Sequence, residues 1–123
     1  FTAIGNLVVS NDKGGIISPK LSHDKKLIQD ILGVEIVERK IGGHEEVGSC
    51  CLATNKGFLA HPNAEEELKE IEEILKVPGN IGSVNFGFPF PKAGLIANSH
   101  GYVTGLSTSG IEIGKIDEAL GFL

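Results

Sequence analysis

Several residue types are scarce in this sequence of 123 residues or missing from it. It contains no methionine and no tryptophan, and its only cysteines, Cys50 and Cys51, are adjacent. Adjacent cysteines do not provide the disulfide framework of a small secreted domain, so we expect a reducing, cytoplasmic environment. A long apolar run and a signal-peptide pattern are also lacking, which argues against a membrane-spanning segment. Since methionine is missing and Phe1 comes first, we expect a piece of a longer protein.

Positive charge is also in short supply. The chain has 11 Lys and Arg residues against 16 Asp and Glu residues, so its net charge is −5. Binding to nucleic acid through phosphates requires clustered basic side chains, so we expect a basic protein as the partner instead. Apolar residues make up 41% of the sequence, which is enough for one ordinary domain with a core.

The stretch at residues 47–62 occurs three times in related form. Moving it back by 43 positions places four residues on identical ones, so that Gly48, Lys56, Gly57 and Pro62 match Gly5, Lys13, Gly14 and Pro19. Moving it forward by 44 positions places Gly57 on Gly101 and Leu52-Ala53 on Ile96-Ala97. The copies agree at turn glycines and apolar strand positions, where backbone geometry and burial dictate the residue type. We therefore expect three tandem units, residues 1–46, 47–91 and 92–123, each with a strand, a tight turn, a strand, a helix and a returning strand.

One helix with an apolar stripe is expected in each unit. The expected stripes are Leu27, Ile28, Ile31 and Leu32, then Leu68, Ile71 and Leu75, then Ile113, Ile116 and Leu120. The expected N-caps are Ser22, Asn63 with Glu66 as a capping box, and Ser109 with Glu112 as a capping box. The outer face of the second helix carries Glu65 and Glu72. We interpret this acidic face as solvated, and the alternative is a docking surface.

Two segments depart from the repeat. Residues 78–92 place Phe86, Phe88 and Phe90 between glycines and prolines, which excludes a regular helix or central strand. These rings either pack under the loop as core or anchor a partner. The third unit stops at its helix and lacks a returning strand, so we expect an open strand edge beside residues 94–97 or 102–104.

The repeated turns are the candidate binding residues. In a closed ring of units they would share one rim, and polar loops on a rigid scaffold are where binding usually occurs. The residues concerned are Asn11, Asp12 and Lys13 in the first turn, Asn55 and Lys56 in the second, and Asn98, Ser99 and His100 in the third. The alternative is that the asparagines serve turn geometry alone.

Catalytic, metal and phosphate sites find little support. Cys50 and Cys51 are consecutive strand positions in the repeat, so at most one faces a central site. They align with Leu7 and Val8, and such apolar surroundings raise the pKa of a thiol and leave it inert. The four histidines lack metal-ligand spacing, and no phosphate-binding glycine motif is present. We therefore expect no cofactor and no metal.

A set of motifs, taken in order, resembles a known family. They are Ala3-Ile4-Gly5-Asn6-Leu7 with Ser10-Asn11-Asp12 and Pro19, Val47-Gly48-Ser49 with Thr54-Asn55-Lys56-Gly57 and His61-Pro62, and Gly82-Ser83-Val84-Asn85-Phe86-Gly87 with Ala97-Asn98-Ser99. Together with Thr108-Ser109-Gly110-Ile111-Glu112 and Asp117-Glu118-Ala119-Leu120-Gly121, they resemble the family of translation initiation factor 6, the ribosome anti-association factor, in its archaeal form.

This resemblance implies an α/β fold of the pentein type, with five units about a pseudo-fivefold axis, of which the chain would hold the last three. It implies a binding function without catalysis: the factor binds the large ribosomal subunit, chiefly through a ribosomal protein near the sarcin-ricin loop, and prevents premature joining with the small subunit. The full-length factor would be a monomer without a small-molecule substrate. Asn11 matches a position on the ribosome-facing surface of the family.

Two other functions stay open from the sequence. Other penteins are amidine-modifying enzymes with a cysteine nucleophile, and such an enzyme would release ammonia, urea or ornithine from arginine or agmatine. A purely structural repeat protein that assembles with itself is the second alternative.

Overall fold

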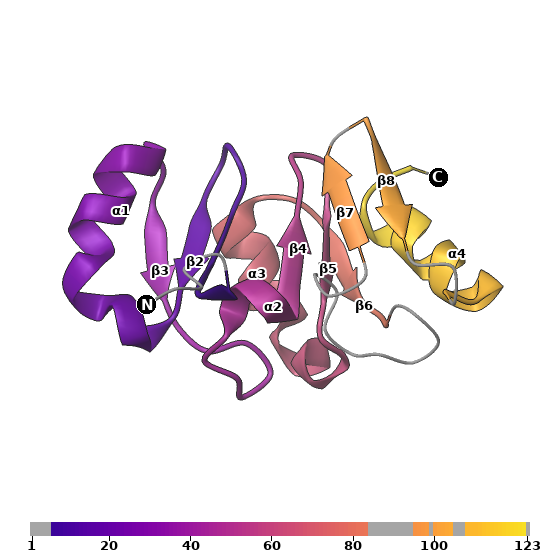
Figure 1. Ribbon diagram of the computed structural model, residues 1–123, viewed down its shortest axis with the longest axis horizontal. Helices are drawn as coiled ribbons and strands as arrows, with labels where there is room; N and C mark the ends of the chain where they lie inside the picture. Colours follow the sequence, from indigo (N-terminus) through magenta and orange to yellow (C-terminus); the bar gives the residue numbers. More distant parts are fainter. Residues whose placement is uncertain (1–5, 84–94, 99, 105–107, 123) are drawn as a thin grey trace.

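The computed structural model describes residues 6–83, 95–98, 100–104 and 108–122 (Figure 1). Strand β1 (Val8–Ser10) pairs antiparallel with β2 (Gly15–Ile17), and β3 (Ile36–Glu38) pairs parallel with β2. Strands β4 (Cys51–Ala53), β5 (Phe58–Ala60) and β6 (Gly79–Ile81) repeat this order and this pairing. In the described part of the third unit, β7 (Leu95–Asn98) and β8 (Gly101–Thr104) form an antiparallel pair. The expected α/β class is confirmed.

Helices follow the strand pairs. The first two units each have a 3-10 segment followed by an α-helix: η2 (Pro19–Asp24) with α1 (Lys25–Leu32), and η3 (Pro62–Glu67) with α3 (Leu68–Leu75). A short helix, α2 (Val47–Cys50), leads into β4, and α4 (Gly110–Ala119) follows β8. Strand–turn–strand–helix–strand therefore occurs twice in succession.

Two of the three expected helix caps are wrong. The helical segments begin earlier, after Ser18 and His61, because Pro19 and Pro62 directly follow and proline is well suited to the first helical position. Ser18 Oγ accepts a hydrogen bond from the Lys20 N–H at 3.1 Å, and His61 Nδ1 accepts one from the Asn63 N–H at 3.0 Å. Ser22 and Asn63 therefore lie inside helical segments, and Asn63–Glu66 forms no cap there. The Ser109–Glu112 capping box is confirmed.

The apolar stripes of α3 and α4 are buried, whereas that of α1 is not. Ile71, Leu75, Ile116 and Leu120 are fully buried, but Leu27, Ile31 and Leu32 are 59%, 73% and 41% exposed. Helix α3 packs against β2 of the preceding unit as well as against β6, and α4 packs against β5 and β6. Helix α1 instead contacts β3 and η2 of its own unit, and Figure 1 shows it at one end of the molecule with no sheet beyond it. The expectation that the first stripe is buried was wrong, because a helix in this fold is covered by the sheet of the preceding unit. Ile113, from the expected stripe of α4, is also exposed (37%).

The first two hairpin turns approach the end of the next unit's helix very closely. A Cβ atom on Gly14 would lie 2.1 Å from the Ile74 carbonyl oxygen in α3, and one on Gly57 would lie 2.0 Å from the Ala119 carbonyl oxygen in α4. Only glycine permits such backbone contact. One hydrophobic cluster accordingly joins the first and second units and another joins the second and third.

The first two sheets each contain a pair of neighbouring residues in which one is large and the other is glycine, but the large residue lies on opposite strands in the two sheets. Gly15 on β2 pairs with Ile36 on β3, whereas Phe58 on β5 pairs with Gly79 on β6. A Cβ on Gly15 would lie 2.7 Å from Ile36 Cδ1, and one on Gly79 would lie 2.3 Å from the Phe58 ring. Since interiors are close-packed, the same space is filled from opposite strands in the two units.

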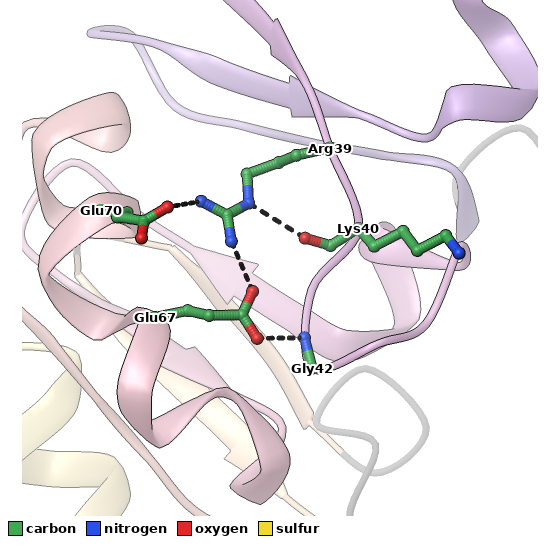
Figure 2. A network of polar contacts seen from close by, with 5 residues as sticks. All are labelled: Arg39, Lys40, Gly42, Glu67 and Glu70. Carbon is green, nitrogen blue, oxygen red and sulfur yellow. Dashed lines mark hydrogen bonds and ion pairs between the residues drawn. The ribbon is translucent and has the colours of Figure 1, made fainter.

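Polar contacts attach the segments that follow β3 and β6 to the helical segment of the next unit. Arg39, which follows β3, forms ion pairs with Glu67 at 2.6 Å and with Glu70, and Glu67 also accepts a hydrogen bond from the Gly42 N–H at 2.9 Å (Figure 2). At the next junction, Ser83 donates to Glu112 Oε2 at 2.5 Å. Glu67 and Glu112 occupy equivalent positions in their units.

Two sequence expectations fall on residues that are not described. Phe86, Phe88 and Phe90 lie outside the described residues, and so does Gly94 of the strand edge expected to be open. In the described part of the chain, no helix has the length and apolar character needed to cross a membrane.

The burial pattern predicts unequal effects of matched substitutions. Ile71 is fully buried, so Ile71→Ala should reduce the free energy of unfolding of this chain by about 2–5 kcal/mol. The control is Ile28→Ala in the equivalent, half-buried position, which should cost clearly less. Urea denaturation measures both changes. Equal losses would contradict the role of the preceding sheet in burying the helix.

Candidate functional site

The rim, defined as the turns at residues 11–14, 54–57 and 98–101, lies along one edge of the molecule. Figure 1 shows the three hairpin turns projecting along the upper edge. The first two turns are closed by hydrogen bonds from the Asn11 N–H to the Gly14 carbonyl at 3.0 Å and from the Thr54 N–H to the Gly57 carbonyl at 2.9 Å. The structure therefore places the predicted turn residues of the first two units at equivalent points of their hairpins.

Asn11 is bound within the fold on every side of its amide. Its Oδ1 accepts hydrogen bonds from the Lys13 and Gly14 N–H groups at 2.8 and 3.0 Å. Its Nδ2 donates to the carbonyls of Thr54 and Leu75 at 3.1 and 3.0 Å. The Asn11 side chain therefore joins two units of the fold.

Asp12 and Asn55 form a reciprocal pair across the two turns. The Asp12 N–H donates to Asn55 Oδ1 at 2.8 Å, and Asn55 Nδ2 donates to Asp12 Oδ2 at 2.8 Å. Both residues are exposed. Two candidate residues that are 43 positions apart in the sequence thus form one polar surface element.

The remaining rim candidates differ in what the structure places around them. Lys13, Lys56 and His100 are exposed. Lys56 Nζ lies 5.5 Å from the centroid of the Phe122 ring, which links the second turn to the end of the third unit. The Asn98 backbone pairs with Gly101, while the side chain of Asn98 and all of Ser99 lie outside the described residues.

Sequence reasoning overlooked Thr54, the counterpart of Asn11. Thr54 is buried, and its Oγ1 accepts hydrogen bonds from the Lys56 and Gly57 N–H groups at 3.1 and 3.3 Å, as Asn11 Oδ1 does in the first turn. The 43-residue shift that matches Gly57 to Gly14 also places Thr54 on Asn11, and this signal was available. The bonds of Glu67 and Glu112 to the preceding units were overlooked as well, because their partners lie far away in the sequence.

The two cysteines are unsuited to nucleophilic chemistry. Cys50 ends helix α2 and Cys51 begins β4, so the expected pair of consecutive strand positions is wrong, and both residues are fully buried. Burial and the nearby carboxylates of Glu46 and Glu67 raise the pKa of the Cys50 thiol to about 11. The expected rise in thiol pKa is confirmed for Cys50, which stays in its poorly nucleophilic thiol form.

His61 is a buried helix cap whose charged form is disfavoured. Its ring centroid lies 4.7 Å from that of His44. Burial, and then the charge of His44, lower the pKa of His61 below its ordinary value of 6.5. Protonation at Nδ1 would also remove the hydrogen bond from the Asn63 N–H. Over the described residues, no group of three or more His, Cys, Asp and Glu side chains is placed to hold a metal ion.

The pKa of His61 predicts a loss of stability in acid. The unfolded chain takes up a proton at this site before the folded chain does, so stability is complete above about pH 6.5 and falls as the pH drops toward the lower, folded pKa. His61→Ser, which copies the Ser18 cap of the first unit, should reduce the loss of unfolding free energy between about pH 7.5 and about pH 5.5. Denaturation at both pH values measures it. His23→Ser is the exposed control, and an unchanged pH dependence in His61→Ser would contradict the prediction.

Known proteins resemble this chain over its whole length. The eIF-6 family matches residues 1–119. The chain is 48% identical to translation initiation factor 6 of Thermococcus onnurineus (strain NA1) and 47% identical to that of Pyrococcus abyssi (strain GE5 / Orsay), in both cases over 100% of the chain and 55% of the relative. It is 43% identical to the factor of Methanosarcina mazei, over 100% of the chain and 57% of the relative.

The chain thus spans little more than half the length of these curated relatives. Since the family match covers residues 1–119, from the first residue to the end of α4, the chain belongs to the eIF-6 family.

Proposed function

We propose that the protein is a translation initiation factor that binds the large ribosomal subunit and prevents premature joining with the small subunit. The observation that carries this proposal is the eIF-6 family match over residues 1–119. The proposal concerns the whole factor, of which the chain corresponds to about half in length. The factor acts in the cytoplasm, where subunits join, and functions as a monomer without cofactor or catalysis.

The rim is the contact surface in this proposal. Its first two turns expose Asp12, Lys13, Asn55 and Lys56 on hairpins that hydrogen bonds hold together. Turns fixed in this way lose little conformational freedom on binding, so more of the contact energy contributes to affinity. A rigid body bound at the face where the subunits meet excludes the second subunit sterically, and no chemical step is required.

Charge supports a protein contact near the sarcin-ricin loop, as the family resemblance implies. The chain has a net charge of −5, and ribosomal proteins are basic. Complementary charge increases the rate of association and suppresses wrong partners. The amidine-modifying alternative gains no support, because both cysteines are fully buried and the pKa of Cys50 is raised to about 11.

A pair of charge reversals tests the rim. Asp12→Lys in the full-length factor should weaken binding to purified large subunits about tenfold, because a basic partner meets a cation instead of a carboxylate. Glu65→Lys changes the net charge equally on the exposed outer face of η3 and should change the affinity little. Co-sedimentation with large subunits measures both, and the factor should not co-sediment with whole ribosomes. A larger loss with Glu65→Lys would place the contact on the acidic helix face.

We also propose that the units form a closed, pentein-type ring in the full-length factor, with units at residues 1–46, 47–91 and 92–123. Ile28, Ile31 and Leu32 occupy the places of the buried Ile71, the partly buried Ile74 and the buried Leu75. Asp24 at the start of α1 occupies the place of Glu67, which binds the preceding sheet's exit. A preceding unit would cover this stripe as the first unit covers α3, and the edge of the third sheet would be completed from the start of the full-length chain.

Ile28→Ala separates a closed ring from an open one. In the 123-residue chain it should cost little, and in the full-length factor it should cost about 2–5 kcal/mol, like Ile71→Ala. Denaturation of the four proteins measures this difference. A small cost of Ile28→Ala in the full-length factor would exclude a covering unit.

A further inference from the structure

The hydrogen-bonding capacity of Asn11 is fully used inside the fold. A primary amide offers two N–H donors and an oxygen with two acceptor sites. Nδ2 donates to two carbonyls, those of Thr54 and Leu75, and Oδ1 accepts from two N–H groups, those of Lys13 and Gly14. The opposite orientation of the amide would point N–H groups at N–H groups and oxygen at oxygen. Asn11 therefore has no hydrogen bond left to offer to a partner.

The second unit shows which of these bonds a turn needs. Thr54 occupies the place of Asn11 and accepts hydrogen bonds from the next two turn N–H groups, those of Lys56 and Gly57. Thr54 Oγ1 also donates to the Gly57 carbonyl at 3.3 Å, which lies in the same turn, so closing the turn needs no bond to another unit. The two donated bonds of Asn11 do something else: they attach the first turn to the second turn and to the end of α3.

What these donated bonds position is the Asp12–Asn55 pair. The pair spans the same two turns, and both of its residues are exposed. Within the described residues, Asp12 Oδ1 accepts no hydrogen bond and Asn55 uses only one of its two Nδ2 hydrogens. An acceptor and a donor therefore lie side by side at the surface. They complement a peptide group or an amide side chain, and the negative charge of Asp12 disfavours a phosphate.

We propose that Asn11 is a positioning residue and that the Asp12–Asn55 pair, which it holds in place, makes the contact with a protein of the large subunit. This inference rests on the proposed function. It assigns separate roles to neighbouring residues of the rim: Asn11 determines where the pair lies, and the pair provides the donor and the acceptor. It predicts that Asn11 and Asp12 act on binding through one shared contact.

A double-mutant cycle in the full-length factor tests this assignment. Asn11→Thr copies Thr54, so it keeps the turn acceptor and removes the two donated bonds. Asn11→Thr and Asp12→Ala should each weaken binding to purified large subunits about tenfold, and the double variant should bind about as the weaker single variant does. Effects that multiply in the double variant would mean that Asn11 contributes to binding independently of the pair, and would overturn the inference.

Two further variants control for stability and for charge. Ser18→Ala removes a helix cap at the end of β2 opposite to the turn, and it should reduce stability without changing affinity. If Ser18→Ala weakened binding as Asn11→Thr does, general destabilisation would account for both losses and the positioning role would be wrong. Asp12→Asn removes the charge and retains an oxygen, so it should weaken binding to a protein donor, whereas stronger binding would indicate a phosphate and overturn the protein contact.

Failure of the inference can be told apart from failure of the proposed function. If the unaltered factor does not co-sediment with large subunits, the proposed function is wrong. If the unaltered factor binds and the losses of Asn11→Thr and Asp12→Ala multiply, only the positioning role is wrong. Binding is measured at a temperature at which circular dichroism shows every variant to be folded.

Discussion

Close backbone contact between each of the first two hairpin turns and the next unit's helix is the constraint on which the structure depends. Gly14 meets the Ile74 carbonyl and Gly57 meets the Ala119 carbonyl at distances that leave no room for a Cβ. Helix ends carry carbonyls without intrahelical partners, and Asn11 satisfies one of these at Leu75. The same contact buries the apolar stripe of the helix and brings successive turns side by side. Core packing and rim geometry are thus two results of one arrangement.

Because this contact is made by backbone atoms, the side chains around it can differ between units, provided that a change at one position is compensated at another. The exchange between Gly15–Ile36 and Phe58–Gly79 fills one volume from opposite strands. Ser18 and His61 cap equivalent segments with an oxygen and with a ring nitrogen. The glycines at turn position four do not vary between the first two units, since no neighbouring change could restore the space. The turn glycines, which the backbone geometry requires, are therefore the same in the two units. The packing and capping residues differ, because a change at one position can be compensated at a neighbouring one.

This distinction explains how much the sequence could predict. The period of about 43 residues located the hairpins and the class of fold, because turn glycines and apolar strand positions recur locally. The exposure of α1 was missed, since an apolar stripe does not reveal which neighbour covers it. The bonds of Asn11 to Thr54 and Leu75 span 43 and 64 positions, and no local pattern contains them. The candidate turns were thus predictable, but the division of roles within them required the folded structure.

The rim combines rigidity with freedom of composition, and this follows from the same division. The side chains of Asn11 and Thr54 form the hydrogen bonds that close their turns, so the fold determines these two residues. The exposed turn residues can instead vary to suit a partner; they are Asp12, Lys13, Asn55 and Lys56. A surface whose loops are already fixed gains affinity without ordering them on binding, and small changes in the exposed residues alter the partner without altering the turn. A series of units whose turns are closed by their own inner side chains can therefore present a rigid surface with exposed residues that are free to vary.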